Sequence, residues 1–348
     1  MYTALLIVFG FITGTLAAHY TVLPLPYMLA PLITAAFIAL GFPKVLPLAY
    51  VFPMRFRLIF IAIIGLMIGA RVTPELVASL PSYWPSVVAI ILFVIVAHSG
   101  NTYLFHKLGK YDKNTAFYAA APGGLMESIA MGEAAGCNIQ LLMLQQFLRI
   151  ILTIVLVPVG ISLWTGAPVG SASGVSLAIA PHVPSLSELA TAVAVGAIGL
   201  LVGLKLKIPA GQLMGPMLAA ACVSVSGLTS IDLPNGVINF AQVVIGVSLG
   251  IRFKGIAATM IRKALWLSLT SVLFMLGLGG GLTLILIKVT ELPPLVLLIS
   301  FAPGGVTEMS LIALSLAANP ALVSLHHLVR ILLTVISLWF FGPRGVRE

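Results

Sequence analysis

Charged residues are scarce in this sequence. Asp, Glu, Lys and Arg make up 8% of its 348 residues, whereas soluble domains carry about 25%. Hydrophobic residues make up 60%, and the mean hydropathy is +1.16. A chain this poor in charge cannot present a water-compatible surface over most of its area, so lipid is the solvent that suits it. The composition therefore predicts an all-α membrane protein that crosses the bilayer several times.

Cysteines and catalytic motifs are also nearly missing. The two cysteines, Cys137 and Cys222, are too few and too far apart to suggest a disulfide framework or a zinc site. The six histidines are scattered, or adjacent in a pair that suits no shared metal. The sequence contains no phosphate-binding P-loop, no nucleophile elbow and no HExxH motif. We therefore expect no enzyme, no cofactor and no metal.

The basic residues outnumber the acidic ones, 18 to 9, but they occur in short clusters between apolar runs. This distribution is typical of topology determinants in membrane proteins. No polar stretch is long enough to form a nucleic-acid-binding domain, so we expect no nucleic-acid partner. Residues 1–20 lack the basic region and cleavage motif of a signal peptide, which predicts a first membrane helix. We therefore predict a multi-pass protein of the inner (plasma) membrane.

One stretch of the sequence occurs twice, at a constant offset of 181 residues. Residues 121–149 read APGGLMESIAMGEAAGCNIQLLMLQQFLR, and residues 302–330 read APGGVTEMSLIALSLAANPALVSLHHLVR. Further matches lie outside this motif, because Gly65 and Gly69 have counterparts in Gly246 and Gly250. We therefore predict two repeats, residues 1–163 and 187–348. The linker between them, residues 164–186, contains no Lys, Arg, Asp or Glu and is rich in Gly, Ser and Pro.

Each predicted repeat contains six apolar segments. They lie near residues 3–20, 27–43, 56–71, 84–106, 114–136 and 139–163, and near 187–204, 209–227, 239–252, 264–287, 293–317 and 321–342. If all six cross the membrane, the two repeats are parallel. If one segment in each repeat does not cross, five crossings remain and the second repeat is inverted.

The basic residues discriminate between these two topologies. When the Pro-Gly-Gly segments enter and leave on one side and the N-terminus is cytoplasmic, 14 of the 18 Lys and Arg residues lie inside. Two lie outside, Arg71 and Lys288, and two lie within the membrane, Arg149 and Arg330. With six crossings per repeat the split becomes 9 inside and 7 outside. The positive-inside rule therefore favours inverted repeats with both termini cytoplasmic. A non-crossing segment at Pro31 and Pro216 instead would keep the inversion and move some loops.

The repeated Pro-Gly-Gly motifs predict a helix break at membrane depth. Proline lacks an N–H, and glycine tolerates backbone conformations that other residues avoid. Interrupted helices at matching positions of inverted repeats are typical of secondary transporters. The helix that starts after each break would point its N–H groups at a polar cavity, which suits an anion. Tight helix packing by small residues is the alternative explanation. The motif residues expected in the site are Pro122, Gly123, Gly124, Pro303, Gly304 and Gly305.

Two acids and two arginines accompany the motifs at equal spacing. Glu127 and Glu308 follow the glycines, and Arg149 and Arg330 lie in the next helix. An ionisable residue within the membrane is costly and marks a functional site by default. We expect the glutamates to carry protons and the arginines to be their partners. The alternative is a permanent structural Glu–Arg pair.

Several other polar residues are candidates for the same site. Ser128 and Thr307 are plausible hydroxyl contacts, although hydroxyls also pack ordinary membrane helices. Gln146 matches His327 three residues before the arginines, which suggests a polar interior at this depth in both repeats. Asn138 and Asn319 are secondary candidates.

These features resemble the AbrB-type family of polytopic membrane proteins. The residues that carry the resemblance are the two APGG motifs, the downstream arginines, the MxxP segment Met28–Pro31 with its counterpart Leu213–Pro216, and the twofold repeat. Members carry the names regulator of aidB expression and ammonia monooxygenase. The resemblance thus implies a regulatory effect, or a membrane oxidase, which would need clustered metal ligands that the sequence does not provide.

The residues favour a proton- or ion-coupled secondary transporter of a small anionic or polar solute, in which the two motifs flank one site. H⁺ or Na⁺ is the expected coupling ion, and any effect on gene expression is then indirect. The alternative is a membrane sensor that regulates gene expression through a protein partner, and the least favoured interpretation is the oxidase. Apart from the lipid bilayer and the solute, a homo-oligomer is left open.

Overall fold

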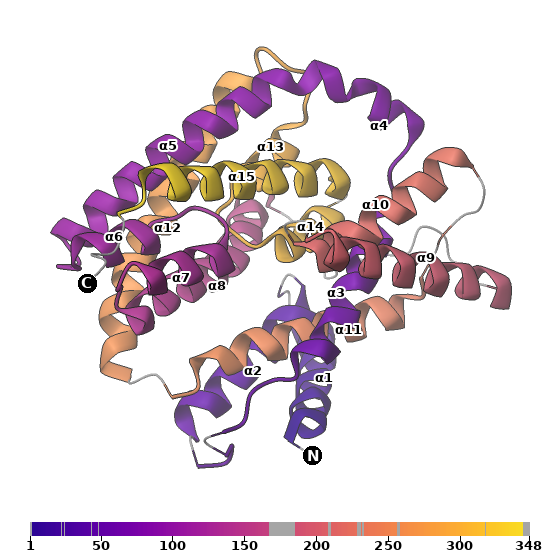
Figure 1. Ribbon diagram of the computed structural model, residues 1–348. Coiled ribbons are helices and arrows are strands. Elements are labelled where there is room, and N and C mark those ends of the chain that lie inside the picture. The colour runs from indigo at the N-terminus through magenta and orange to yellow at the C-terminus, as the bar shows by residue number, and fades with distance from the viewer. Residues whose placement is uncertain are drawn as a thin grey trace. The chain divides into compact units, whose positions relative to one another are not determined.

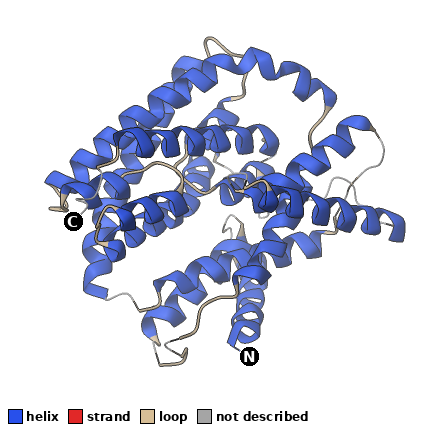
Figure 2. Cartoon of the chain, in the orientation of Figure 1, coloured by secondary structure: helices blue, strands red, loops and turns tan. Residues whose placement is uncertain are grey.

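The computed structural model describes residues 2–343 except 22, 24, 43, 48, 167–184, 208–209, 228–230, 232, 256–257 and 317. The described residues form helices, turns and loops, with no strand among them (Figure 2). The first half contains α1 (Tyr2–Tyr20), α2 (Pro26–Gly41), α3 (Met54–Gly69), α4 (Pro74–Ser79), η1 (Leu80–Tyr83), α5 (Trp84–Lys107), α6 (Lys113–Ala119), α7 (Leu125–Ala134) and α8 (Ile139–Thr165). The second half contains α9 (Leu186–Lys205), α10 (Gly211–Ser226), α11 (Asn235–Gly250), η3 (Ile251–Phe253), α12 (Ala258–Leu286), α13 (Pro294–Phe301), α14 (Val306–Ser315) and α15 (Pro320–Phe341).

Seven helical stretches in the described residues are long and apolar enough to cross a membrane. They are Tyr2–Tyr20, Pro74–Lys107, Ile139–Trp164, Leu186–Lys205, Asn235–Phe253, Met260–Leu286 and Pro320–Phe341. The prediction of an all-α protein that crosses the bilayer several times is confirmed at this level. The expected linker, residues 164–186, lies mostly outside the described residues, and the bounds of the two repeats stay a prediction.

The two Pro-Gly-Gly motifs both interrupt a helix. The first lies between α6 and α7, and the second lies between α13 and α14. In each half, the interrupted pair follows a long helix, α5 or α12, and precedes another, α8 or α15. The order of elements in the second half therefore repeats that of the first, with the break at the same place.

By its internal contacts the chain divides into two compact units. The first unit contains Met1–Ala78, Pro158–Ile256 and Ser310–Ala321, and the second contains Ser79–Val157, Ala257–Met309 and Leu322–Glu348. Each unit thus takes matching helices from both halves of the sequence. The first holds α1–α3 and α9–α11, while the second holds both breaks, α5–α7, α12, α13 and most of α8 and α15.

Within the first unit, the helices of the two halves pack reciprocally. Helix α2 lies against α11, and α3 lies against α10 (Figure 1). A methyl group at Gly246 would overlap the carbonyl oxygen of Met28, and a methyl group at Gly65 would overlap that of Leu213. The glycines therefore let the backbones of the paired helices touch. Since Gly65 matches Gly246 and Met28 matches Leu213, both crossings use the same contact.

Helices α2 and α10 also begin alike and contain a proline at the same position. Each is preceded by a buried or half-buried residue with a left-handed backbone, Leu25 at φ 48° and Ala210 at φ 51°. Such a conformation is costly for a residue other than glycine and persists only where the surroundings impose it. Each helix is 16 residues long and contains a proline at its sixth position, Pro31 or Pro216. Both are shorter than the roughly 20 residues that a full crossing needs.

Within the second unit, α12 packs against α5 and α13. Gly279 of α12 lies directly against Phe301, the last residue of α13, whose ring centroid is 5.6 Å from that of Phe93 in α5. A cluster of small and aromatic side chains packs α6 against α8, including Tyr118 and Leu142. These contacts fix the ends of α6 and α13, at which the two breaks begin.

Candidate functional site

The first break is a buried loop between two short helices. Helix α6 ends at Ala119, and Pro122, Gly123 and Gly124 are all buried. Gly124 caps α7 with a left-handed backbone, φ 60° and ψ 56°, which glycine adopts at no steric cost. A methyl group at Gly123 would lie 3.3 Å from Thr334 Oγ1 of α15, so this loop packs on that helix. Proline and the two glycines therefore produce the break that their chemistry predicts.

The second break has the same form. Helix α13 ends at Phe301 and α14 begins at Val306, with Ala302, Pro303 and Gly304 buried between them. Gly304 lies against Met309 of α14, the helix that follows the break. At both breaks, buried backbone groups lie outside any helix. Their carbonyl oxygens therefore need hydrogen-bond partners from elsewhere in the protein.

Side chains of α8 provide those partners at the first break. The Arg149 guanidinium donates from Nη1 to the carbonyl oxygen of Ala121, the residue before Pro122. Gln146 directs its Nε2 at the carbonyls of Tyr118, Ala119 and Ala121, at 3.2, 3.1 and 3.3 Å. Both side chains are buried, Arg149 with 6% of its surface exposed and Gln146 with none.

The same geometry recurs at the second break. Arg330 of α15 donates from Nη1 to Ala302 O at 2.5 Å and from Nη2 to Gly304 O at 2.8 Å. His327 contacts the carbonyl of Ile299 through Nε2 at 3.0 Å. Arg149 with Ala121 and Arg330 with Ala302 have the same separation of 28 residues, and so do Gln146 with Tyr118 and His327 with Ile299. The repeat is thus preserved in its hydrogen bonds.

A physical reason connects these residues to the breaks. The last carbonyls of a helix have no partner within that helix and carry its partial negative charge. Gln146 and His327 contact carbonyls in the last turns of α6 and α13, and Arg149 and Arg330 contact carbonyls just beyond those helix ends. A buried positive charge is therefore placed where the helix dipole stabilises it, and the orphan carbonyls are satisfied.

The contacts of His327 define its protonation. Arg330 Nη2 lies 2.9 Å from His327 Nδ1. A guanidinium has only donors, so Nδ1 accepts and carries no proton, and the ring proton is on Nε2, which donates to Ile299 O. A proton on Nδ1 and the bond from Arg330 exclude one another. This coupling has no counterpart in the first repeat, where Gln146 replaces the histidine.

Both glutamates lie beside the glycines of their own motif. A methyl group at Gly124 would lie 3.3 Å from Glu127 Oε2, and one at Gly305 would overlap Glu308 Oε2. Each carboxylate is in the first turn of a helix, α7 or α14, where the positive end of the helix dipole favours it. Glu308 is 5% exposed and Glu127 is more accessible. The structure thus brings the Pro-Gly-Gly residues, an arginine and a glutamate together at each break.

The arginines and glutamates differ in what they contact. The hydrogen bonds of Arg149 and Arg330 go to backbone carbonyls and, for Arg330, to His327. The sequence suggested the glutamates as their partners, and that pairing stays a prediction. The sequence did not reveal that the carbonyls of Ala121 and Ala302 accept hydrogen bonds from the arginines. Both residues belong to the repeated motif, and their equal spacing from the arginines was the available signal.

The remaining candidates have local roles. Asn138 Oδ1 accepts from Leu141 N at 3.1 Å, and Asn319 Oδ1 accepts from Ala321 N at 3.1 Å. The two side chains therefore cap α8 and α15, the helices that carry the arginines. The fully buried Ser128 directs Oγ at Gly123 O at 3.5 Å. Thr307 is half-buried in the first turn of α14.

The sequence aligns the pair His326 and His327 with Gln145 and Gln146, and the first residue of each pair points to a neighbouring helix. His326, next to His327, lies 2.7 Å through Nε2 from Ser86 Oγ of α5. Gln145, next to Gln146, donates to Tyr111 Oη at 2.7 Å and accepts from Ser268 of α12. These adjacent residues therefore tie α8 and α15 to the long helices of the same unit.

Three buried polar atoms of the site have no hydrogen-bond partner among the described residues. They are Nε of Arg149, Nε of Arg330 and Oε1 of Gln146. Unsatisfied buried donors are rare in proteins, and a buried guanidinium with an unpartnered N–H favours an anion beside it. Across the described residues, no group of three or more His, Cys, Asp or Glu side chains is placed to hold a metal.

Comparison with known proteins agrees with the motifs. The profile of the family described as "Transition state regulatory protein AbrB" matches residues 44–343. A relative from Escherichia coli (strain K12), named "Putative regulator AbrB", is 26% identical over 336 residues, which cover 96% of this chain and 92% of the relative. The "Uncharacterized protein YhjN" of Bacillus subtilis (strain 168) is 27% identical over 288 residues, or 78% of this chain and 74% of the relative. This chain, with its several apolar membrane-type helices and two Pro-Gly-Gly breaks, therefore belongs to the AbrB family.

Proposed function

We propose that this protein is a proton- or ion-coupled secondary transporter of a small anionic or polar solute. The observation that carries the proposal is the matched pair of buried breaks, each contacted by an arginine whose Nε has no partner among the described residues. Interrupted helices that meet ions or substrates with their ends are the usual construction of secondary transporters. The helices α7 and α14 add their N-termini, which favour negative charge.

The two arginines would contribute unequally. A guanidinium has five N–H donors. Among the described residues, Arg149 has one hydrogen bond, whereas Arg330 has three. Arg149 therefore keeps more donors for a solute, and Arg330 is the more structural of the two. We assign the solute carboxylate or other anionic group mainly to Arg149.

The glutamates Glu127 and Glu308 would be the coupling groups. Each lies at a break, where a bound proton or Na⁺ changes the charge that the solute meets. His327 adds a second proton-sensitive contact in one repeat, because protonation of Nδ1 would remove the acceptor of Arg330. Release of that bond would free Arg330 only in the second repeat.

The architecture we propose is a pair of inverted repeats in the inner (plasma) membrane, with both termini cytoplasmic. Its support is that an inverted topology would place 14 of the 18 Lys and Arg residues in the cytoplasm, as the positive-inside rule favours, together with the reciprocal packing of α2 with α11 and of α3 with α10. Each compact unit takes its helices from both repeats. Movement of one such bundle relative to the other is the usual basis of alternating access.

Uptake into proteoliposomes tests the proposal. Small carboxylates and amino acids would be screened under an imposed pH or Na⁺ gradient, with Glu127→Gln as the variant. Wild-type protein should accumulate a solute, and the variant should lose the dependence on the gradient. The matched control is Glu133→Gln, because Glu133 lies exposed on the same helix and its counterpart in the second repeat is Leu314. A Glu127→Gln protein with unchanged gradient dependence would remove this residue from the coupling mechanism.

The second candidate function is a membrane sensor that acts on gene expression through a protein partner. The observation that favours it is the word regulator in the name of the Escherichia coli relative. The same uptake experiment discriminates between the two. If no gradient drives any solute and a cytoplasmic protein co-purifies stoichiometrically, the sensor is the better account, whereas an active carrier makes a regulatory effect indirect.

A further inference from the structure

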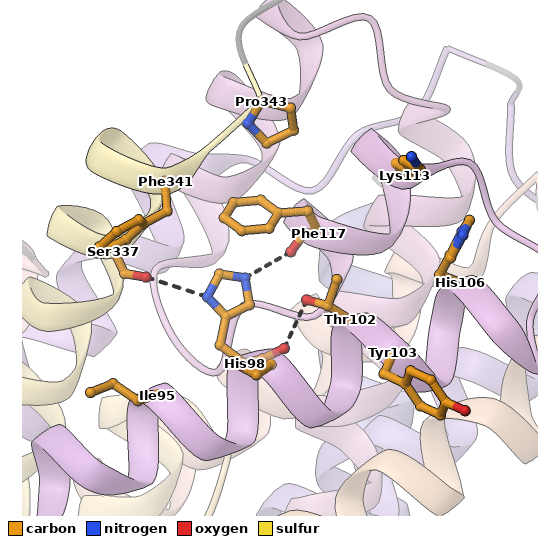
Figure 3. Close-up of a pocket in the computed structure, with 11 residues that line it drawn as sticks. Ile95, His98, Thr102, Tyr103, His106, Lys113, Phe117, Ser337, Phe341 and Pro343 are labelled. Carbon is orange, nitrogen blue, oxygen red and sulfur yellow. Dashed lines mark hydrogen bonds between the residues drawn. The ribbon is translucent and has the colours of Figure 1, made fainter.

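A cavity lies in the same compact unit as the breaks but is lined by other residues. It has a volume of about 760 Å³ and lies between α5, α6 and α15 (Figure 3). Its wall includes Ile95 and Ser99 of α5, Phe117 of α6 and Phe341 of α15. Ligand pockets typically have volumes of about 300–1,000 Å³. We propose that this cavity binds one molecule of an anionic phospholipid, with an acyl chain along α5 and the phosphate at Lys113 and His106.

The cavity has the length that an acyl chain requires. Its lining on α5 runs from Ile95, near the middle of the helix, to His106, one residue from its end. At 1.5 Å per residue these positions are about 16 Å apart along the helix axis. One leaflet is half of the hydrocarbon core, or about 15 Å. The cavity thus extends from the membrane interior to the interface.

Three polar side chains in the middle of the cavity, His98, Thr102 and Ser337, are hydrogen-bonded within the protein. His98 Nε2 lies 3.0 Å from Phe117 O, and its Nδ1 lies 3.5 Å from Ser337 Oγ (Figure 3). Thr102 donates to His98 O at 2.7 Å. These bonds leave the rings and aliphatic groups of Ile95, Phe117 and Phe341 as the surface that a ligand would meet. An acyl chain matches this lining, and a polar metabolite does not.

One end of the cavity is basic. Figure 3 shows Lys113 and His106 on the side of His98 away from Ile95. The segment 107–113 reads KLGKYDK and adds two exposed lysines, Lys107 and Lys110. Its single acid, Asp112, accepts from Thr115 N at 2.9 Å as the cap of α6, so its carboxylate is engaged. Basic pockets at the ends of membrane helices bind anionic lipid headgroups.

These two features together select the occupant. A free phosphate would use only the basic end, and a neutral lipid would use only the apolar part. An anionic phospholipid uses both. His106 also donates from Nδ1 to Tyr111 O at 2.9 Å, which holds the segment that carries Lys110 and Lys113 close to the end of α5.

Thermal unfolding of the purified protein in an uncharged detergent tests the proposal with three probes: phosphatidylglycerol, phosphatidylcholine and glycerol phosphate. Phosphatidylglycerol should raise Tm more than phosphatidylcholine, because a ligand stabilises the native state in proportion to its occupancy. Glycerol phosphate should leave Tm unchanged. Equal shifts from the two lipids, or a shift from glycerol phosphate as large as that from phosphatidylglycerol, would overturn the assignment.

Two variants and a control locate the effect. Combined Lys113→Gln and His106→Gln should abolish the preference for phosphatidylglycerol, and because Lys113 is exposed and His106 only partly buried the fold should persist. Ser99→Phe should fill the cavity from an exposed position and reduce the shift from both lipids. Lys288→Gln removes an exposed lysine that does not line the cavity. A preference that survives the double substitution, or that Lys288→Gln reduces equally, would contradict the proposal.

Discussion

Single polar residues within the apolar helices are explained by the backbone they contact. Arg149, Gln146, Arg330 and His327 are each directed at carbonyls at or just beyond the end of a half-helix. An unpartnered buried carbonyl costs about 1–3 kcal/mol. The four side chains therefore stabilise the breaks, and what remains of their donor capacity is available for a solute.

The exchange of glutamine and histidine between the repeats gives a prediction for His327. His327→Gln reproduces the first repeat, where Gln146 reaches the equivalent carbonyl, so it should fold with little loss of stability. His327→Leu leaves the carbonyl of Ile299 and one donor of Arg330 without this partner, and should destabilise by about 1–3 kcal/mol. Thermal unfolding of both variants measures the difference. Equal Tm values for the glutamine and leucine variants would contradict the role assigned to the ring.

The two cysteines should differ in their dependence on pH. Burial, with a smaller effect of the Asp112 charge, raises the pKa of the Cys137 thiol to about 11. The reactive form is the thiolate, whose ordinary pKa is about 8.5. Cys137 in a Cys222→Ser variant should therefore react with iodoacetamide very slowly at pH 7.5 and faster towards pH 11. Because the folded pKa is raised, the contribution of this thiol to stability is complete below pH of about 8.5 and is lost as the pH rises through 11.

The exposed Cys222, measured in a Cys137→Ser variant, is the control for that experiment. It should react readily under the same conditions. Labelling of folded Cys137 at pH 7.5 as fast as that of Cys222 would show that the thiol is not buried as described.

At the scale of helices, the sequence predicted most of the elements because hydrophobicity and glycine spacing encode them locally. The apolar segments near 139–163 and 264–287 correspond to α8 and α12, and both motifs interrupt a helix. The crossing partners were not predictable. Gly65 and Gly69 have the GxxxG spacing that is typical of close helix packing. Nothing in the sequence of α3, however, shows that its partner is α10, from the other half of the chain. Likewise, the carbonyl partners of the arginines depend on the shape of the breaks rather than on side-chain identity.

The reciprocal crossings predict a strong effect of size at Gly246. Its methyl group would overlap the Met28 carbonyl, so Gly246→Val should force α2 and α11 apart and destabilise by about 1–3 kcal/mol or more. Gly236→Ala, on the same helix with no neighbouring atom within 4 Å, is the matched control. It should be neutral or stabilise by up to about 1 kcal/mol through helix propensity. Unfolding measurements that rank the two variants in the opposite order would exclude the close crossing.

For the whole molecule, inversion predicts the side on which each loop is exposed. In a background of Cys137→Ser and Cys222→Ser, Lys288→Cys should react with a membrane-impermeant maleimide on intact cells. Lys110→Cys should react only after the membrane is permeabilised, because it belongs to a basic cluster that the positive-inside rule places in the cytoplasm. With parallel repeats Lys288 would be cytoplasmic as well, so protection of both positions would contradict inversion.

The compact units also take on meaning at this scale. Each combines helices from both halves of the sequence. One unit contains both breaks, the two arginines and the two glutamates. A single unit thus carries nearly all of the proposed transport machinery. This is the arrangement expected if the solute is held by one bundle while access alternates.

The central claim is that Arg149 holds the solute at the breaks, and one comparison tests it most directly. Gradient-driven uptake and Tm would be measured for Arg149→Gln beside Arg330→Gln. Glutamine keeps a donor for the single carbonyl that Arg149 contacts, so Arg149→Gln should fold with a Tm near that of the wild type and lose uptake. Arg330→Gln should lose Tm as well, since three bonds depend on that guanidinium. Full uptake by Arg149→Gln protein would contradict the account.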